Sequence, residues 1–408
     1  MSGLVDWTQA LSPEQVPIDR AGAGLNTQSL DRLRWVLQSE VERQRLPGAV
    51  AFIARRGCVA LYESMGFCDP AARQPMPVDA LFRIYSMTKP IVSVAVMMLV
   101  EQGRLLLSDP VSRHLPEYLG QQVARLTEGR PETVPVRQGA TVQDLLRHTA
   151  GLTYEFLGNS AVHRAYAQAR IGARERSNDA FSKVLGALPL VAEPGTAWEY
   201  SRATDVLGRL VEVASGQSLG RYLTEHILLP LGMRETAFQV PGGQHHRLAE
   251  PFPRDPDGGL QMKVIDVREA AALESGGGGL VSTALDYARF LQFMLNRGTL
   301  NGRRLLGSRT VDFMTSDHLG EIPVWSAASQ ALLPAGHGFG LGFAVRKARG
   351  LANVPGSIGS YFWGGMAGTT FFVDPAEDLF AILMLQAPNQ REYYRMLFRN
   401  LVYAALDD

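Results

Sequence analysis

Residues 83–103 have the sequence RIYSMTKPIVSVAVMMLVEQG. From Ile91 to Val100 the side chains are apolar on nearly every side of a helix, and a helix of that kind is buried inside a protein. Gly103, followed by a Ser-Asp-Pro turn, marks its end. The apolar run is about half of what spans a bilayer, so we expect a core helix and no membrane segment.

Strand-like runs lie on both sides of this helix along the chain. Residues 48–54 and 58–64 are apolar or alternating runs around a tight turn, which indicates a hairpin. The remaining predicted elements are helices at 27–43, 285–297 and 391–406 and strands at 338–345, 369–374 and 379–386. We therefore expect an α/β (α+β) fold, with one sheet assembled from both ends of the chain and covered by helices.

The segment between these two ends reads mostly as helices and loops. A chain of 408 residues exceeds what one hydrophobic core usually supports, which favours two lobes. We predict an α/β domain of residues 1–113 and 277–408 and an inserted helical domain of residues 114–276, with a ligand site in the cleft between them. Residues 1–20 are expected to form a loose arm.

The composition favours a cytoplasmic protein that acts on a small molecule. Forty basic and forty acidic side chains cancel, and no block of like charge gives the electrostatic footprint of a nucleic-acid binder. The first twenty residues lack the features of a secretory signal. Cys58 and Cys68 are interpreted as free thiols of a reducing cytoplasm, with one bridge between them as the alternative. Nothing indicates a cofactor or an oligomeric state.

Ser86 and Lys89 are the first candidates for chemistry. A serine and a lysine three residues apart on a helix share a face, so the amine can approach the hydroxyl. Pro90 supports a position near the first helical turn, because proline fits where a backbone N–H has no intrahelical partner. The positive end of the helix favours negative charge on that hydroxyl. The spacing also arises by chance in roughly one such chain in four or five.

The tripeptide Tyr200-Ser201-Arg202 precedes a predicted helix. A tyrosine can shuttle a proton if a neighbouring cation stabilises its phenolate, because its free pKa of about 10 is too high. Lys89 would be that cation. The alternative is an ordinary half-buried aromatic residue.

Residues 362–366, with the sequence Phe-Trp-Gly-Gly-Met, lead into the strand predicted at 369–374. Two glycines let a substrate lie close against the backbone. The backbone N–H of Met366 would then join that of Ser86 as an oxyanion hole. The alternative is a plain bend at the end of a strand.

Together these three sites resemble the serine hydrolases related to class C β-lactamases, and most closely the penicillin-binding-protein-like esterases called family VIII carboxylesterases. The pattern of that family is Ser-x-x-Lys, then Tyr-x-Asn, then Lys-Thr-Gly or a substitute. The resemblance covers roughly residues 25–400, and the blocks that carry it, in family order, are residues 83–118, 141–152, 193–233 and 276–295. It implies a mainly antiparallel sheet flanked by helices, with an inserted helical domain.

The resemblance also implies roles for individual residues. Ser86 is the nucleophile, and Lys89 is either its base or the cation that keeps Tyr200 deprotonated. Tyr200 passes the proton to the leaving group, and the backbone amides of Ser86 and Met366 form the oxyanion hole. The residues expected to contact substrate are Trp363, Gly364, Gly365, Arg202 and Tyr154.

Two positions depart from the family pattern. Arg202 replaces an asparagine that positions the lysine and the acyl group, and its guanidinium either favours the phenolate or points away. Trp363 replaces the lysine with which β-lactamases grip a substrate carboxylate, and an indole favours neutral, apolar substrates. The predicted function is hydrolysis of short or medium-chain carboxylic esters. The alternatives are acyl transfer to an alcohol or amine, cleavage of β-lactams or amides, and a non-catalytic ligand-binding relative.

Other motifs are weaker. His245, His246 and Glu250 lie in a Pro/Gly-rich loop without a metal-ligand spacing, so no metal site is predicted. His148 is interpreted as a structural hydrogen-bonding residue. The absence of a Gly-x-Ser-x-Gly elbow argues against an α/β-hydrolase, and the glycines at 276–279 lack the lysine of a phosphate loop.

Overall fold

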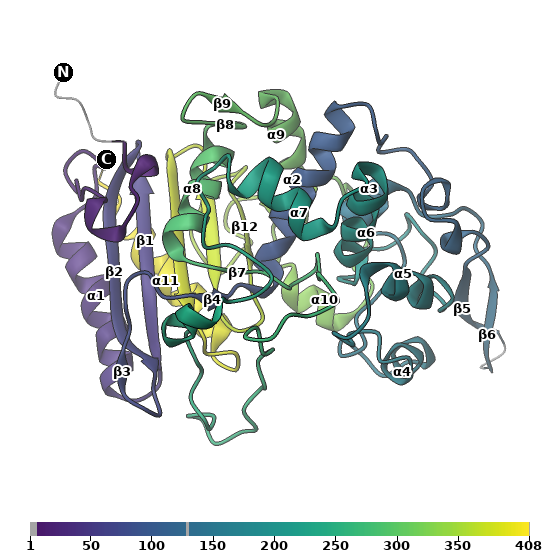
Figure 1. Cartoon of the computed structure of the whole chain (residues 1–408), viewed down its shortest axis with the longest axis horizontal. Coiled ribbons are helices and arrows are strands. Elements are labelled where there is room, and N and C mark those ends of the chain that lie inside the picture. The colour runs from purple at the N-terminus through teal and green to yellow at the C-terminus, as the bar shows by residue number, and fades with distance from the viewer. Residues whose placement is uncertain (1–5, 128–129, 408) are drawn as a thin grey trace.

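The computed structural model describes residues 6–127 and 130–407. Its centre is an eight-stranded sheet with the order β10-β11-β12-β13-β14-β1-β2-β3, and every neighbouring pair is antiparallel (Figure 1). The two ends of the chain meet where β1 pairs with β14, with Ala49 opposite Leu385. These strands are β1 (Gly48–Arg55), β2 (Cys58–Asp69), β3 (Gln74–Pro75), β10 (His337–Phe339), β11 (Ala344–Arg346), β12 (Tyr361–Gly364), β13 (Thr370–Asp374) and β14 (Leu379–Leu385). The prediction of a mainly antiparallel sheet built from both ends of the chain is confirmed.

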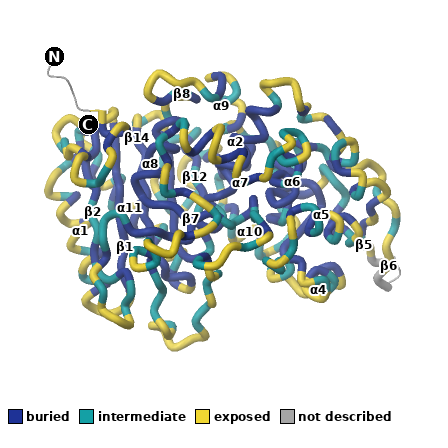
Figure 2. Tube along the Cα trace, viewed as in Figure 1, coloured by how far each residue is buried: buried dark blue, intermediate teal, exposed yellow. Residues whose placement is uncertain are grey.

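Most residues of the central strands are buried (Figure 2), and their apolar side chains belong to two separate cores. In β1, Phe52 belongs to the larger core, which continues into the helical part of the molecule, and Ile53 belongs to the core under α1 (Thr27–Glu42) and α11 (Arg391–Tyr403). Successive side chains of a strand point to opposite faces, so a strand covered on both sides is apolar without alternation. This explains the continuous apolar sequence of β1.

The predicted buried helix is α2 (Thr88–Glu101), and all of its residues up to Leu99 are buried. It packs against α6 (Ala203–Ser215) on the side away from the sheet, while α8 (Ala284–Leu295) packs on β1 and β14. The other helices are α3 (Val142–Leu146), α4 (Ala161–Gln168), α5 (Asn178–Gly186), α7 (Leu219–Leu223), α9 (Ser308–Met314) and α10 (Ala327–Leu332). The short strands outside the main sheet are β4 (Phe82–Arg83), β5 (Gln122–Thr127), β6 (Arg130–Pro135), β7 (Val281–Ser282), β8 (Thr299–Leu300) and β9 (Arg303–Arg304).

Three local expectations differ from the structure. The middle segment contains the hairpin of β5 and β6, whose prolines and charged residues hide any apolar alternation. The single strand expected at 338–345 is two paired strands, β10 and β11, because the chain turns through Gly340–Gly342. β12 was not predicted as a strand of its own. The domain boundaries at 113/114 and 276/277 stay a prediction.

The N-terminal segment is not the loose arm that we expected. Trp7 is 3% exposed, and its ring lies 5.2 Å from that of Phe52. Ala10 and Val16 are also buried in the larger core. One tryptophan among polar residues gives no periodic signal, which is why the sequence did not predict this packing. Residues 1–5 lie outside the described part of the chain.

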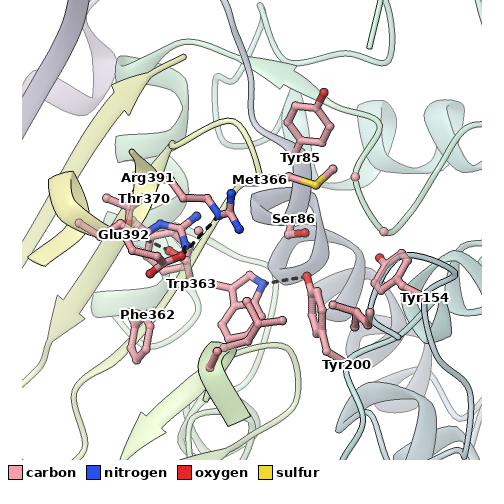
Figure 3. Close-up of a pocket in the computed structure, with 18 of the residues that line it drawn as sticks. Tyr85, Ser86, Tyr154, Tyr200, Phe362, Trp363, Met366, Thr370, Arg391 and Glu392 are labelled. Atoms are coloured by element: carbon pink, nitrogen blue, oxygen red, sulfur yellow. Dashed lines mark hydrogen bonds and ion pairs between the residues drawn. The ribbon is translucent and has the colours of Figure 1, made fainter. Parts of the chain in front are cut away.

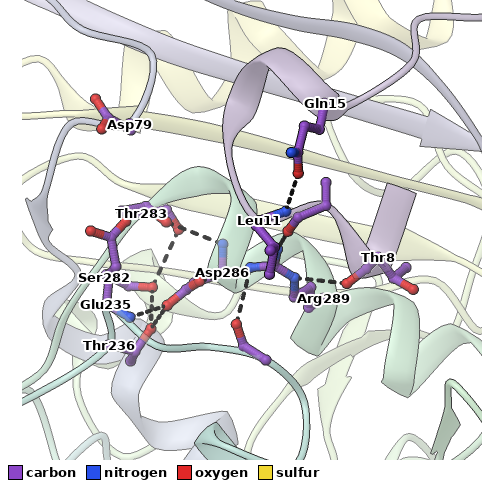
Figure 4. Close-up of polar contacts among 12 residues, drawn as sticks. Thr8, Leu11, Gln15, Asp79, Glu235, Thr236, Ser282, Thr283, Asp286 and Arg289 are labelled. Carbon is purple, nitrogen blue, oxygen red and sulfur yellow. Dashed lines mark hydrogen bonds and ion pairs between the residues drawn. The ribbon is translucent and has the colours of Figure 1, made fainter. Parts of the chain in front are cut away.

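Arg289 of α8 holds this segment in place (Figure 4). Its guanidinium donates hydrogen bonds to the backbone carbonyls of Thr8, at 3.0 Å, and Ala10. It also pairs with the carboxylate of Asp286 at 2.9 Å, and both side chains are buried. Burial raises the pKa of Asp286 to about 6. The hydrogen bonds of Arg289 therefore link α8 to the start of the chain, and the buried ion pair with Asp286 holds the guanidinium in place.

We expect Arg289→Met to lower the free energy of unfolding by about 3–5 kcal/mol, because Asp286 is then a buried charge without its partner. The loss of unfolding free energy should be smaller at about pH 5 than at about pH 8, because Asp286 is mostly protonated, and therefore neutral, at the lower pH. Denaturant unfolding followed by circular dichroism measures the free energy of unfolding at each pH. Arg297→Met, in an exposed pair with Asp312, is the control and should leave the midpoint unchanged. Equal losses in the two variants would contradict this interpretation.

Candidate active site

The candidate nucleophile lies on a short 3₁₀ turn, Tyr85–Met87, that leads directly into α2. Every residue from Leu81 to Leu99 is buried except Ser86, which is half-exposed. Its hydroxyl is therefore the one polar side-chain group that this buried stretch presents to the outside. The position agrees with the expectation of a serine at the head of the buried helix.

The backbone at this turn is strained. Tyr85 has a φ of 43°, in the left-handed region that bulky residues rarely adopt. The surroundings hold it there: the N–H of Ile84 donates to Leu280 O at 3.1 Å, and the Tyr85 hydroxyl accepts a hydrogen bond from the N–H of Ile265 at 2.8 Å. Strain of this kind persists only where neighbouring structure enforces it, and it is concentrated at functional sites. Here it fixes the orientation of Ser86.

Lys89 lies under the nucleophile and is 1% exposed. Its amine is 3.2 Å from Ser86 Oγ, 2.9 Å from the hydroxyl of Tyr154 and 2.6 Å from Gly277 O. Burial lowers the pKa of Lys89 to about 7, because the charged form loses its hydration. A large part of the lysine population is therefore neutral at neutral pH, and a neutral amine at this distance can accept the proton of Ser86.

Tyr200 lies just before α6 and is also buried. Its hydroxyl accepts a hydrogen bond from Trp363 Nε1 at 3.2 Å, and the Lys89 amine is 4.6 Å from its ring centroid. Burial raises the pKa of Tyr200, although hydrogen bonding with Ser86 opposes that change. The phenol is consequently protonated at neutral pH. In Figure 3, Ser86 lies between this hydroxyl and the side chain of Met366.

His148 packs behind Tyr200, with 4.9 Å between the two ring centroids. Its Nδ1 shares a hydrogen bond of 3.1 Å with the hydroxyl of Ser201. Burial, followed by the charge of Lys89, lowers the pKa of His148 well below its ordinary value. A neutral, fully packed histidine fits the structural role expected from the sequence.

Arg202 neither touches the Tyr200 hydroxyl nor points away into solvent. Its guanidinium carbon lies 4.8 Å from the ring centroid of Tyr154 and its Nη2 is 2.6 Å from Glu155 Oε1. The stacked guanidinium holds the ring of Tyr154, whose hydroxyl contacts Lys89. Tyr154 was predicted to contact substrate. The structure places it in the cleft wall and also in the hydrogen-bond shell of the amine.

Asp205 is a site residue that the sequence did not reveal. Its Oδ1 accepts hydrogen bonds from Ser275 Oγ at 2.5 Å and from the N–H of Gly277 at 3.0 Å. These bonds fix the glycine loop whose carbonyl accepts from Lys89. The carboxylate is 2% exposed, and its charge raises the pKa of Lys89 while that of Arg202 lowers it. An acidic residue in the first turn of α6 is too common a pattern to have been singled out.

The end of β12 packs directly against the nucleophile turn. A Cβ on Gly365 would lie 2.4 Å from Ile84 O, and a Cβ on Gly364 would lie 2.7 Å from the guanidinium of Arg395. Position 365 has no room for a side chain, because Ile84 O is a backbone atom, whereas position 364 is limited by the end of a flexible arginine side chain. Gly365 is therefore required for packing, and Gly364 lines the cleft where a substrate was expected to approach the backbone. The same contact brings Met366 to the cleft beside Ser86.

The sequence also did not reveal that a cation lies near Trp363. Arg395 of α11 donates to Gly365 O at 2.5 Å and to Glu392 Oε1 at 2.7 Å. Its charge is thus engaged by a carboxylate and by the strand that it supports. A residue of the last helix carries no sequence signal that connects it to a strand about thirty residues earlier.

These residues converge on one cleft of about 940 Å³ (Figure 3). Its lining includes most of the predicted site residues: Ser86, Tyr154, Tyr200, Arg202, Trp363, Gly364 and Met366. The amine of Lys89 lies below the surface of the cleft, in contact with Ser86. Gly365 packs against Ile84, behind the turn that carries Ser86. The folded chain therefore brings these predicted segments together at one cleft.

Other side chains gave no further site. Within residues 6–127 and 130–407, no group of three or more His, Cys, Asp or Glu could hold a metal ion. His245 Nε2 instead shares a hydrogen bond with Val240 O at 3.0 Å.

Cys58 and Cys68 are both buried free thiols, so the alternative of a bridge between them is wrong. None of the described helices has the length and hydropathy of a membrane span.

Comparison with known proteins places the chain in one family. The Beta-lactamase family matches residues 33–405. An uncharacterized protein of Mycobacterium tuberculosis is 35% identical over 348 residues, which cover 84% of this chain and 86% of that protein. Esterase EstB of Burkholderia gladioli is 33% identical over 387 residues, 90% of this chain and 93% of the esterase. The solved structure of EstCE1, a hydrolase with promiscuous acyltransferase activity, has a TM-score of 0.77 at 29% identity and covers 92% of this chain and 99% of its own.

The pKa of Lys89 predicts when Ser86 is reactive. Labelling of Ser86 by a fluorophosphonate should increase with pH through a midpoint near about 7, because the amine accepts a proton only in its neutral form. Arg202→Gln should move the midpoint upward, since a positive charge that lowers the pKa of Lys89 is lost. Mass spectrometry of the peptide that contains Ser86 measures both. The control is Arg164→Gln at an exposed arginine of α4. A midpoint near 10.5, the ordinary value for lysine, would contradict the prediction.

Proposed function

Because the chain belongs to the Beta-lactamase family, we propose that it hydrolyses short and medium-chain carboxylic esters through an acyl-enzyme on Ser86. The observation that carries the proposal is the buried amine of Lys89, 3.2 Å from the Ser86 hydroxyl. A base at that distance with a pKa of about 7 is what a serine nucleophile needs at neutral pH. The similarity to Esterase EstB supports the same reaction.

The first half of the reaction forms the acyl-enzyme. Ser86 Oγ attacks the ester carbonyl carbon, and its proton passes to the amine of Lys89. The backbone N–H groups of Ser86 and Met366 stabilise the oxyanion. Tyr200 donates its proton to the leaving alkoxide when the C–O bond breaks, and regains one from the Lys89 ammonium. Water then attacks the acyl carbonyl through the same groups and releases the acid.

The two pKa shifts favour one of the roles that the sequence left open for Lys89. Burial lowers the pKa of Lys89 and raises that of Tyr200. A neutral amine and a neutral phenol are therefore favoured over an ammonium beside a phenolate. We assign Lys89 as the base and Tyr200 as the acid.

Trp363 favours esters over β-lactams. Its indole N–H is directed to the Tyr200 hydroxyl, and its ring packs against those of Tyr200 and Phe339. The position that holds a lysine in β-lactamases is thus filled by an apolar wall. Arg395 does not replace that lysine, because Glu392 and Gly365 O engage it.

Acyl transfer to an alcohol is the second candidate. EstCE1 is a hydrolase with promiscuous acyltransferase activity, and the two chains correspond over nearly their full lengths. The acyl-enzyme would be the same and only the acceptor would differ. Addition of a primary alcohol during turnover separates the two reactions, because transfer yields a new ester in place of the acid.

Lys89 and Tyr200 are expected to act as one unit. Lys89→Ala and Tyr200→Phe should each lower kcat/KM for an ester by about 10²–10⁴-fold, the usual contribution of a positioned acid or base. The double variant should lose far less than the product of the two losses. Lys183→Ala, at an exposed lysine paired with Asp179, is the control and should retain full activity. Multiplicative losses would show that the two residues act separately.

A panel of p-nitrophenyl esters with a chromogenic cephalosporin tests the function itself. We expect turnover of the esters, little or no turnover of the cephalosporin, and an acyl mass on the peptide that contains Ser86. Ser86→Ala should abolish both the ester turnover and the acyl mass, whereas a non-catalytic relative would give neither. Trp363→Lys should raise cephalosporin turnover relative to ester turnover by about 10–100-fold, the effect of one charge-assisted contact. Cephalosporin hydrolysis that rivals ester hydrolysis in the unmodified protein would contradict the assignment.

A further inference from the structure

One side of the cleft is an apolar recess that the chemistry at Ser86 does not use. We call it the apolar arm. Its walls are formed by Phe156, by Phe238 and by a loop that contributes Met262, Ile265, Ala271 and Leu273.

Each of the three walls contacts a residue that is next to a catalytic group in the chain or in space. The N–H of Ile265 donates to the hydroxyl of Tyr85, the residue before Ser86. The ring of Phe156 stacks on Tyr154 with 4.9 Å between centroids. Phe238 packs on Gly279, where an added Cβ would lie 2.8 Å from its ring. The arm therefore begins at the reacting atoms and is not a separate surface groove.

The chemistry of the arm suits an uncharged group. The guanidinium of Arg202 at its edge is paired with Glu155, and that of Arg174 donates to the backbone carbonyl of Asp266. Phe156 is 55% exposed, which is unusual for a large aromatic side chain that stacks on a buried one. Such a ring gains burial when an apolar ligand covers it.

The size of the cleft also favours a large ligand. At about 940 Å³ it is near the upper end of the roughly 300–1,000 Å³ found for pockets that enclose drug-sized ligands. An ester with a short group on both sides of the carboxyl would leave most of this volume without contacts. Each buried methylene contributes about 0.8 kcal/mol, or about four-fold in affinity. A ligand that leaves the arm empty therefore binds much more weakly than one that fills it.

We propose that the physiological substrate is an ester in which one half is a bulky, uncharged apolar group bound in the apolar arm. This inference rests on the proposed esterase function and narrows its substrate class. The carboxyl carbon of the ester lies at Ser86, where the acyl-enzyme forms, and the other half of the ester is small.

Two adjacent alanines allow a matched test. Ala271 lines the arm, whereas its neighbour Ala272 is exposed and does not line the cleft. Ala271→Trp should fill the arm. The kcat/KM of Ala271→Trp, Ala272→Trp and the unmodified protein is measured for p-nitrophenyl acetate, for p-nitrophenyl adamantane-1-carboxylate with a bulky acyl half, and for 1-adamantyl acetate with a bulky alcohol half.

Ala271→Trp should lower the ratio of activity on one adamantyl ester to that on p-nitrophenyl acetate by about ten-fold or more, the effect of losing two buried methylenes. The adamantyl ester whose ratio falls identifies the half that occupies the arm. Ala272→Trp should leave both ratios unchanged. Unchanged ratios for both adamantyl esters in Ala271→Trp would overturn the inference.

A second variant guards against a folding defect in Ala271→Trp. Phe156→Ala removes an exposed ring from the arm, and Phe313→Ala removes a similarly exposed ring outside the cleft as its control. The bulky-to-acetate ratio should fall only in Phe156→Ala. If no ester is hydrolysed at all, the proposed function fails and not the assignment of the arm.

Discussion

The centre of this molecule depends on one physical constraint, which is that the amine of Lys89 is buried away from water. A buried ammonium is costly unless acceptors replace its hydration, and Lys89 receives them from Tyr154 and Gly277 as well as from Ser86. Each acceptor must itself be held in place. Asp205 fixes the backbone of Gly277, and the stacked guanidinium of Arg202 fixes the ring of Tyr154.

Ser86 is held by the backbone around it, whereas Lys89 is held by two side-chain hydroxyls and one backbone carbonyl. The left-handed conformation of Tyr85 turns Ser86 outward, and β12 lies so close behind it that only glycine fits at position 365. The hydrogen bond between Tyr85 and Ile265 then ties the same turn to one wall of the cleft. Movement of that wall is consequently coupled to the orientation of the serine.

Much of this architecture could be predicted from local sequence. The apolar run from Ile91 to Val100 specified the buried helix, and the spacing of Ser86 and Lys89 specified their shared face. Partners that depend on contacts between distant segments could not be predicted. Asp205 and Arg395 are charged residues with no pattern of their own, and only the folded chain shows which backbone groups they hold. The packing of Trp7 depends in the same way on a sheet that forms far from it in sequence.

The pairing of β1 with β14 also governs the life of the nascent chain. The pairing of Ala49 with Leu385 requires that residues 50–384 have been synthesised first, so the centre of the sheet closes late in translation. Until then β1 lacks its neighbour β14, and its open edge and apolar side chains are exposed to aggregation. Ser86 is translated early, whereas β12, which ends at the glycines behind it, is translated late. The cleft is therefore complete only after β12 has been made and has joined the sheet.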